Sequence, residues 1–290
     1  MVIATGFFDG VHLGHRLVID SLVKTASLMG EKSAVVTFWP HPRNVLQDDA
    51  RNLRLLTSLQ EKKDILLGLG VDSVEVLNFT KDFSRLTTEE YLQLLKDRYG
   101  ATAIVLGYDN RMGSGDVTTA EVASIAEKMG LKVIHPDAMD EGGSPISSTR
   151  IRKALEAGDV EAASKMLGRP YKLHGVVVAG NRLGRTIGFP TANMQLYEPL
   201  KLVPGNGVYV VDVETVGQRR RGMCNIGTRP TVDNGHQRTI ETNVFDFSED
   251  IYGLDLELFF VSKIRDERRF DSLSDLKIQL EKDREFAIKK

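Results

Sequence analysis

Short apolar runs alternate with segments of helical periodicity through the first half of the chain. The runs predict five strands, over Val2–Thr5, Ser33–Phe38, Asp72–Leu77, Ala103–Leu106 and Lys132–Ile134. The segments between them place apolar residues three or four positions apart, as amphipathic helices do. They predict helices over Gly14–Met29, Leu59–Leu69, Tyr91–Tyr99 and Val122–Met129. Strands joined by helices imply right-handed crossovers, so we expect a parallel sheet with helices on both faces.

Local signals predict where several of these helices begin. Ser58, Thr87 and Thr118 each stand three residues before a glutamate, which is the spacing of a capping box. After the second strand, Pro40 and Pro42 are expected to exclude further regular structure.

After residue 150 the pattern changes to short strands joined by Gly, Pro and Asn turns. Two short helices come first, over Ser148–Gly158 and Val160–Leu167. The strands that follow are predicted over Leu173–Val178, Gly207–Val213, Arg219–Ile226, Thr239–Phe245 and Leu254–Val261. This pattern favours an antiparallel sheet or small barrel, followed by a terminal helix that Ser272 caps. We therefore expect a domain over 1–153, a helical linker over 154–170 and a second domain over 171–290.

Composition narrows the class of protein. The 290 residues are 41% hydrophobic and 27% charged, which is ordinary for globular proteins. The net charge of −2 argues against nucleic-acid binding by bulk phosphate neutralisation. Cys224 is the single cysteine, so no intrachain disulfide can form and a reducing cytoplasm fits best. We expect no signal peptide, no membrane span, and a few further residues upstream of the strand that begins at Val2.

The string Gly6-Phe7-Phe8-Asp9-Gly10-Val11-His12-Leu13-Gly14-His15 lies between the first strand and the first helix. Its glycines permit close backbone approach, and a helix N-terminus attracts anions. Histidines there can donate hydrogen bonds to phosphate oxygens as charge develops on them. Ligands of parallel sheets bind at the carboxyl ends of the strands, where this string lies. A glycine-rich turn with surface histidines is the alternative.

A second phosphate-binding segment is predicted at Ser147-Ser148-Thr149-Arg150-Ile151-Arg152. Its hydroxyl groups can cap a helix and bind an anion, and Arg152 adds a positive charge. A plain helix cap with solvent-facing arginines is the alternative.

The second half carries a glycine-punctuated loop that can wrap phosphates, with Gly180, Gly184 and Gly188. It lacks the Gly-Lys-Ser/Thr ending of a P-loop. Thr191 and Asn193 follow, two positions apart on an extended segment, so their side chains point the same way. Such oxygen ligands suit Mg²⁺ bound to nucleotide phosphates. The alternative is a hairpin turn rich in Gly and Asn.

The first half resembles the HxGH nucleotidyltransferase superfamily, and within it the flavin adenylyltransferase module of bacterial bifunctional riboflavin kinase/FAD synthetases. The resemblance rests on the histidine string, on Phe38–Pro42 and on Ile146–Arg152. It implies a Rossmann-like α/β fold in which His12 and His15 stabilise charge during adenylyl transfer. It also implies nucleotide and phosphate contacts from Gly6, Phe8, Asp9, Gly10, Gly14, His41, Gly107, Asp109, Ser148, Thr149 and Arg152.

The second half is similar to riboflavin kinases. Gly188–Asn193 resembles their signature, and the resemblance continues through Gly207–Tyr209, Asn225–Thr231, Glu241–Phe247 and Arg265–Phe270. It implies an antiparallel β-barrel with a terminal helix. By this resemblance Glu241 is the catalytic base, Thr191 and Asn193 bind the metal, and Asn225, Arg265, Glu267 and Phe270 bind flavin.

The resemblance implies that the chain phosphorylates riboflavin with ATP to FMN and adenylylates FMN with a second ATP to FAD, with Mg²⁺ as cofactor. Two positions depart from the family pattern. The segment 107–113 lacks two usual aromatics, with Asn110 and Met112 in it, and Asn243 stands where a histidine is common. A riboflavin kinase with a degenerate first domain and a non-enzymatic flavin-binding regulator are therefore alternatives. The sequence leaves open whether the chain forms a weak homo-oligomer.

Overall fold

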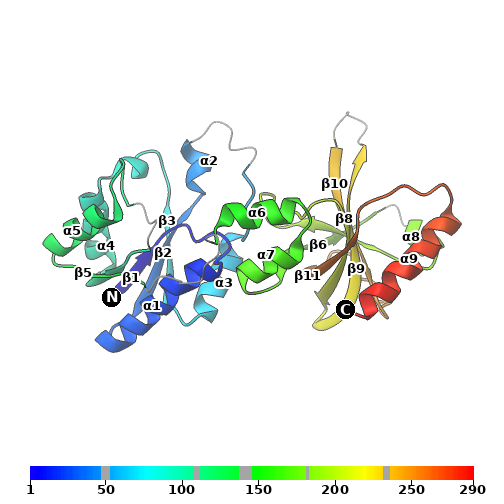
Figure 1. The fold of residues 1–290 in the computed structure, drawn as a ribbon, viewed down its shortest axis with the longest axis horizontal. Coiled ribbons are helices and arrows are strands. Elements are labelled where there is room, and N and C mark those ends of the chain that lie inside the picture. The colour runs from blue at the N-terminus through cyan, green and yellow to red at the C-terminus, as the bar shows by residue number, and fades with distance from the viewer. Residues whose placement is uncertain (47–52, 108–111, 137–145, 181–182, 231–235) are drawn as a thin grey trace. The chain divides into compact units, whose positions relative to one another are not determined.

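A computed structural model describes residues 1–46, 53–107, 112–136, 146–180, 183–230 and 236–290. The chain divides into two compact units, Met1–Ser148 and Thr149–Lys290 (Figure 1). The boundaries expected from the sequence, at 153 and 170, remain predictions.

The first unit is built on a parallel sheet, as predicted. Its strands are β1 (Val2–Thr5), β2 (Ser33–Trp39), β3 (Ser73–Asn78), β4 (Ala103–Val105) and β5 (Lys132–Ile134). Their order in the sheet is β3-β2-β1-β4-β5. In the middle, Val2 lies opposite Ser33 on one side and Ala103 on the other. The chain therefore runs outward from β1 in one direction, returns, and continues from β4 in the other direction.

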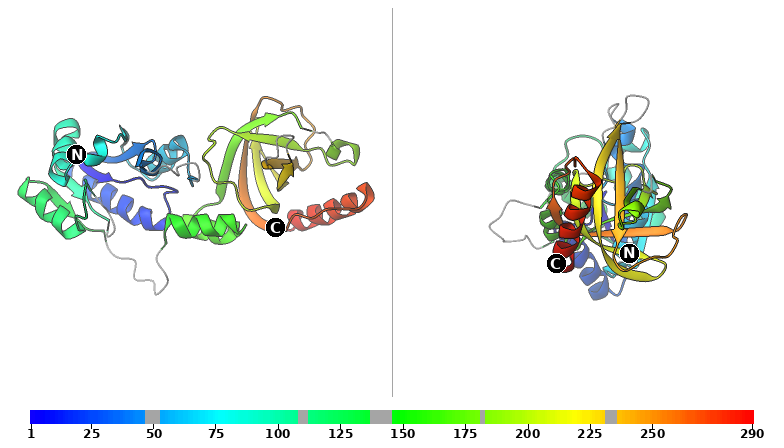
Figure 2. Two further views of the ribbon diagram at one scale, coloured as in Figure 1. Left: turned by 90° about the horizontal axis from the view of Figure 1, so that it is seen from above. Right: turned by 90° about the vertical axis from the view of Figure 1, so that its right-hand side faces the viewer.

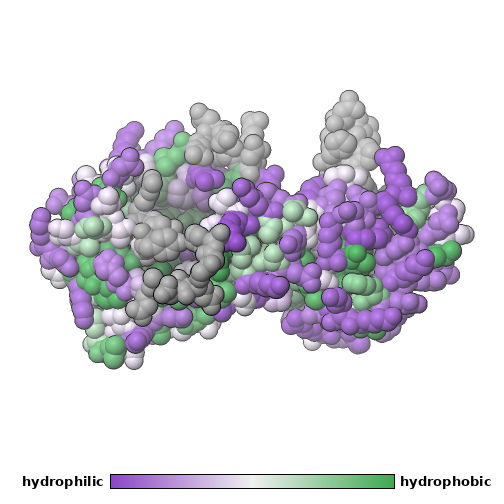
Figure 3. Space-filling model, in the orientation of Figure 1, coloured by the Kyte–Doolittle hydropathy of each residue, from purple (hydrophilic) through white to green (hydrophobic). Residues whose placement is uncertain are grey.

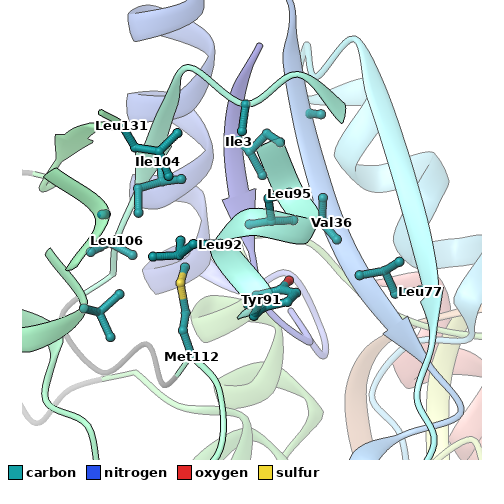
Figure 4. Packing of buried hydrophobic residues seen from close by; sticks show 14 residues of the cluster. Ile3, Val36, Leu77, Tyr91, Leu92, Leu95, Ile104, Leu106, Met112 and Leu131 are labelled. Atoms are coloured by element: carbon teal, nitrogen blue, oxygen red, sulfur yellow. The ribbon is translucent and has the colours of Figure 1, made fainter. Parts of the chain in front are cut away.

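Helices cover both faces of this sheet because successive strand residues point to opposite sides. The main helices are α1 (Leu13–Met29), α3 (Leu59–Gly68), α4 (Thr88–Tyr99) and α5 (Thr119–Lys128). Ile3 and Val36 pack in one apolar cluster with α4 and α5, and Val2 and Val35 pack in another with α1 and α3. Figure 4 shows the first cluster, in which Leu92 lies beside Met112 and Tyr91.

The three predicted capping boxes are present. Ser58, Thr87 and Thr118 each accept a hydrogen bond from the backbone of the glutamate three residues on, which returns one. One expectation was wrong, because a short helix, α2 (Pro42–Leu46), begins at the second of the two prolines. Proline fits the first helical position, where its missing N–H has no helical partner. A 3-10 turn also forms at Phe83–Arg85.

The two predicted helices are present as α6 (Ser148–Glu156), which starts at the last residue of the first unit, and α7 (Val160–Leu167). A closed antiparallel barrel follows, in the order β10-β7-β6-β11-β8-β9 (Figure 2). Its strands are β6 (Tyr171–Val178), β7 (Ala192–Leu196), β8 (Gly207–Thr215), β9 (Gln218–Pro230), β10 (His236–Val244) and β11 (Asp255–Arg265). Two elements were not predicted as such, the strand β7 and the short helix α8 (Leu183–Thr186) inside the glycine-rich loop.

The barrel is filled from the inside by alternate residues of its strands. Tyr171, Leu173, Gly175 and Val177 of β6 are buried, whereas the residues that alternate with them are half-buried. The terminal helix α9 (Leu273–Ile288) packs Ala287 and Leu280 against a cluster that contains Val208 of β8. On the face that Figure 3 shows, hydrophilic side chains cover most of this unit. Among the described helices, none has the length and apolar character that crossing a membrane requires.

Truncation of a core side chain tests the packing of the first unit. Leu92→Ala removes a fully buried side chain of α4, so we expect the free energy of unfolding of this unit to fall by about 2–5 kcal/mol. Leu28→Ala on α1, where the side chain is 79% exposed, is the matched control and should change it by less than about 0.5 kcal/mol. Urea unfolding followed by circular dichroism measures both, and equal losses would contradict the packing described.

Two candidate phosphate-transfer sites

The first site lies where the strand order of the parallel sheet reverses. The neighbours β2 and β4 flank β1, and the loop between β1 and α1 holds the predicted histidine string. Phe8 and Val11 adopt positive φ angles of 50° and 39°, and Gly10 one of 82°. Such a crowded turn brings the N-terminus of α1 to the carboxyl end of β1, which is where ligands bind in sheets of this type.

His12 and His15 form one compact unit at the start of α1. The Nδ1 atom of His12 accepts a hydrogen bond from the backbone N–H of His15 at 3.3 Å, so the ring caps the helix. In its neutral form this ring therefore carries its proton on Nε2. The two imidazoles stack with their centroids 3.6 Å apart. A Cβ atom at Gly14 would lie 3.3 Å from the His12 ring, so the glycine avoids a tight contact with that ring.

Asp9, predicted to bind the nucleotide, holds a neighbouring loop through its carboxylate. This carboxylate is almost fully buried and accepts hydrogen bonds from the backbone N–H groups of Leu56 and Thr57 at 3.0 and 3.2 Å. The Thr57 hydroxyl accepts a bond from the N–H of Gly10 at 3.1 Å. These contacts lock the histidine loop to the segment that leads into α3. A role for Asp9 in nucleotide binding stays a prediction.

Other predicted residues of this site lie around the same loop. Ser148, the last residue of the first unit, donates a hydrogen bond to the backbone oxygen of Asp9 at 2.9 Å. The ring of His41 packs against Phe7, with centroids 4.0 Å apart. Gly107 lies two residues after the end of β4 and is buried.

The remaining predicted residues of the first site stay untested. Thr149 is exposed and Arg152 half-buried on α6. Asp109 lies outside the described residues, as does Asn110.

The departure at Met112 has a structural counterpart. Its side chain is buried in the apolar cluster beside Leu92, and its backbone oxygen accepts a hydrogen bond from the Thr88 hydroxyl at 2.8 Å. A Cβ atom at Gly113, the next residue, would lie 2.5 Å from the Thr88 backbone nitrogen. Met112 and Gly113 therefore attach this segment to the start of α4.

Sequence reasoning missed Lys62, a fully buried lysine next to the histidine loop. Its Nζ atom lies 3.6 Å from the centroid of the Phe7 ring and 3.4 Å from the hydroxyl oxygen of Thr37. Burial lowers the pKa of this ammonium to about 8, against the opposing effect of the Asp9 charge. The sequence could have indicated this burial, because Lys62 stands four residues before Leu66 and seven before Leu69. This spacing places the lysine on the apolar face of α3.

The second site lies on neighbouring strands of the barrel. Glu241 of β10 is opposite Asn193 of β7 on one side and Asn225 of β9 on the other. Side chains directly opposite one another are about 5 Å apart at their Cβ atoms and share one face. Three residues that are widely separated in the sequence thus form a row with a half-buried carboxylate in its middle.

The glycine-rich loop packs closely onto the segment that holds Thr191 and Asn193, in which Asn193 belongs to β7 and Thr191 lies just before it. A Cβ atom at Gly180 would overlap the side-chain amide of Asn193, and one at Gly184 would overlap the backbone oxygen of Phe189. The backbone N–H of Phe189 donates a hydrogen bond back to the oxygen of Gly184 at 2.8 Å. Gly188 has a φ of 85°, which favours glycine. The loop therefore needs these glycines to approach the two predicted metal ligands.

A cavity of about 320 Å³, here named the Glu241 cavity, opens beside this row. All four predicted flavin-binding residues line it: Asn225, Arg265, Glu267 and Phe270. Thr191 and Asn243 line it as well, so Asn243 faces the same side as Glu241, as its strand position predicts. Asn243 donates a hydrogen bond to the backbone oxygen of Pro190 at 2.6 Å, which supports the segment before Thr191.

A second cavity of about 370 Å³, here named the Asp250 cavity, shares Thr191 with the first. Thr242, whose side chain points away from that of Glu241 along β10, lines it together with Arg185, Asp250 and Tyr252. The two cavities therefore meet at Thr191.

Arg265 and Asp283 form an ion pair behind the Glu241 cavity. The guanidinium of Arg265 binds the Asp283 carboxylate through Nε and a terminal nitrogen at 3.0 and 2.8 Å. Asp283 is 1% exposed, and it joins α9 to the end of β11. Arg265 therefore shapes the cavity wall while its charge is already paired, and its role in flavin binding stays a prediction.

The donor set at Thr191 and Asn193 fits Mg²⁺. A hydroxyl and an amide oxygen are the hard ligands that this ion accepts, and phosphate oxygens usually complete its coordination. The close contact between Gly180 and the Asn193 amide holds this side chain at the phosphate loop. These residues are therefore chemically suited to hold the ion.

The two halves match two family models. The FAD synthetase model matches residues 1–150, and the riboflavin kinase model matches residues 167–290. A Bacillus subtilis protein named "Bifunctional riboflavin kinase/FMN adenylyltransferase" is 38% identical over 99% of this chain and 92% of its own length. The Escherichia coli K12 protein of the same name is 37% identical over 97% and 90%. A solved Streptococcus pneumoniae structure, titled a macrolide-efflux protein, is 35% identical, with a TM-score of 0.91 over 99% of this chain and 93% of that one.

Removal of the buried charge on α9 tests the ion pair behind the Glu241 cavity. Asp283→Asn leaves the partly buried Arg265 guanidinium without its counter-charge, so we expect the second unit to lose about 3 kcal/mol of stability. Asp246→Asn is the matched control, because the Asp246–Arg284 pair is exposed and is expected to contribute less than about 1 kcal/mol. Guanidinium unfolding monitors both variants; a small loss for Asp283→Asn would show that the pair does not hold α9.

Proposed function

Because the chain belongs to the family of bifunctional riboflavin kinase/FMN adenylyltransferases, we propose that its two sites catalyse consecutive reactions. The second unit phosphorylates riboflavin with ATP to give FMN. The first unit transfers AMP from a second ATP to FMN, which gives FAD and pyrophosphate. The observation that carries this assignment is the pair of separate sites in one chain, a stacked histidine pair at a helix N-terminus and a carboxylate between two asparagines in a barrel.

In the kinase reaction, we propose that Glu241 accepts the proton of the riboflavin 5′-hydroxyl as its oxygen attacks the γ-phosphate of ATP. A neutral alcohol is a poor nucleophile, and a positioned carboxylate assists as the proton leaves. In this proposal the flavin ring occupies the Glu241 cavity, and the apolar wall that includes Phe270 supports this placement. ATP then enters from the Asp250 cavity and the glycine-rich loop, so that its γ-phosphate meets the hydroxyl near Thr191, which lines both cavities. Bound Mg²⁺ would neutralise phosphate charge there.

In the adenylylation reaction, we propose that the residues around the histidine loop stabilise charge rather than move protons. The phosphate of FMN is already anionic near neutral pH and can attack the α-phosphate of ATP directly, displacing pyrophosphate. His12 and His15 lie at the N-terminus of α1, where the helix dipole and backbone N–H groups favour anions. Ser148, Thr149 and Arg152 are proposed to bind the leaving pyrophosphate, supported by the hydrogen bond from Ser148 to the histidine loop.

We further propose that the enzyme works in the reducing cytoplasm. This rests on the single cysteine, Cys224, which is fully buried in β9. Burial raises the pKa of the Cys224 thiol to about 12, so the residue stays protonated and unreactive. We propose the substrates as riboflavin, FMN and two molecules of ATP, with no role for nucleic acid or membrane.

Replacement of the histidine pair tests the first site. In the double variant His12→Ala/His15→Ala, FAD formation from FMN and ATP should fall by about 10²–10³-fold, because the charge-stabilising donors are gone. FMN formation from riboflavin in the same preparation should be unchanged and serves as the control. Chromatography of the flavins after incubation with ATP and Mg²⁺ gives both rates. If wild-type protein supplied with FMN formed no FAD, the kinase-only alternative would replace this proposal, and formation of neither product would favour the flavin-binding regulator.

Replacement of the proposed base tests the second site. Glu241→Gln should lower FMN formation by about 10²–10⁴-fold while leaving FAD formation from supplied FMN intact. Glu214→Gln on the exposed side of β8 is the matched control and should retain both activities. Loss of both activities in a folded Glu241→Gln protein would contradict the assignment of the two reactions to separate sites.

A further inference from the structure

Lys62 is a buried cation for which the two proposed reactions provide no role. It stands in the first turn of α3, and its side chain is fully buried. Burying an ammonium is costly unless it is paired. The N-terminal turn of a helix also repels positive charge. An apolar residue would fit the stripe of α3 better, so stability alone does not account for a lysine at this position.

The contacts of Lys62 all converge on the histidine loop. Its Nζ atom lies 3.6 Å from the centroid of the Phe7 ring. It also donates a hydrogen bond of 3.4 Å to the hydroxyl of Thr37, which in turn donates one of 3.3 Å to the backbone oxygen of Phe7. The ring of His41 also packs against the Phe7 ring. The ammonium of Lys62 therefore supports Phe7, through its ring directly and through its backbone by way of Thr37. Phe7 lies just after β1 and contacts His41 through its ring.

The charge of Lys62 acts in the same region. The nearby carboxylate of Asp9 favours the charged form of Lys62, whereas burial opposes it more strongly, and the pKa is lowered to about 8. The groups that face this ammonium from the packed elements are Asp9 and the Phe7 ring from the β1–α1 loop and the Thr37 hydroxyl from β2. Asp9 already accepts hydrogen bonds from the backbone of Leu56 and Thr57. In this setting of low dielectric constant, a positive charge acts on nearby anions more strongly than it would in water.

We propose that Lys62 is a positioning residue for adenylyl transfer. Its side chain supports the loop Phe7–Asp9, and its ammonium adds a positive charge close to the phosphates of the bound nucleotide. The inference rests on the proposed function of the first unit. It assigns the buried lysine to the binding of ATP, rather than to proton transfer.

The sign of the pH dependence follows from this role. Lys62 carries its charge below a pH of about 8 and loses it as the pH rises through that value. Because kcat/KM reports ionisations of the free enzyme, kcat/KM for ATP in FAD formation should fall above pH 8. Bound phosphates favour the charged lysine, so the corresponding fall in kcat should begin at a higher pH.

The test measures FAD formation from FMN and ATP by the full-length chain at pH values on both sides of 8. In Lys62→Met, kcat/KM for ATP should be roughly 10-fold lower at neutral pH, equivalent to about 1.4 kcal/mol, and should show no fall near pH 8. The wild-type value should converge on that of Lys62→Met at high pH, because neutral lysine and methionine then resemble each other in charge. Lys63→Met is the matched control, because Lys63 is the next residue and is half-buried rather than fully buried. This variant should keep the wild-type pH profile.

Two further measurements separate positioning from a purely structural role. Replacement of an incompletely paired buried charge by an apolar side chain is often neutral or stabilising, so thermal unfolding of Lys62→Met should not occur at a lower temperature. Lys62→Arg keeps its charge throughout the measured range, so its activity should show no fall near pH 8. The rate of FMN formation should be unchanged in both variants.

Several outcomes would overturn the inference. A wild-type profile without a fall near pH 8, or a fall that persists in Lys62→Met or Lys62→Arg, would remove Lys62 from the reaction. Wild-type protein that forms FMN but no FAD would instead overturn the proposed function of the first unit, and this inference with it.

Discussion

Both sites depend on strands that pair out of chain order, because a buried strand must find partners for its backbone groups. In the parallel sheet, β1 pairs with β2 on one side and with β4 on the other. In the barrel, β7 pairs with β6 and with the much later β10. These pairings bring together segments that are far apart in the sequence, such as the histidine loop with Gly107 and Asn193 with Glu241. Without them, the individual motifs would remain separate turns.

Buried charges show how the two units differ in the way they hold their sites. Asp283 is matched by the fork of Arg265, a geometry that satisfies both partners and ties α9 to the barrel. Asp9 is satisfied mainly by backbone N–H groups, and it ties two loops together. Lys62 has a ring face and one long hydrogen bond. An anion arriving nearby would therefore stabilise the charge of Lys62.

The periodic elements could be predicted from local patterns, and the errors have identifiable causes. The capping boxes at Ser58, Thr87 and Thr118 marked helix starts correctly because their hydrogen bonds form within four residues. The helix at Pro42–Leu46 was excluded wrongly, since proline breaks a helix interior but not its first turn. The strand β7 was read only as an extended segment. Its ladder is completed by β6 and β10, which no local pattern reveals.

The sequence by itself determined the two fold classes, the order of the two units, and the residue types of both sites, since periodicity, caps and glycine-rich turns are local properties. Only the tertiary structure decided which of these residues lie next to one another. It set Glu241 between Asn193 and Asn225, joined two cavities at Thr191, and committed Arg265 to Asp283. It also placed the ammonium of Lys62, a lysine on the apolar stripe of α3, against the Phe7 ring of the histidine loop. The physical reason is that burial and long-range pairing depend on which surfaces meet, and this is a property of the folded chain rather than of any segment.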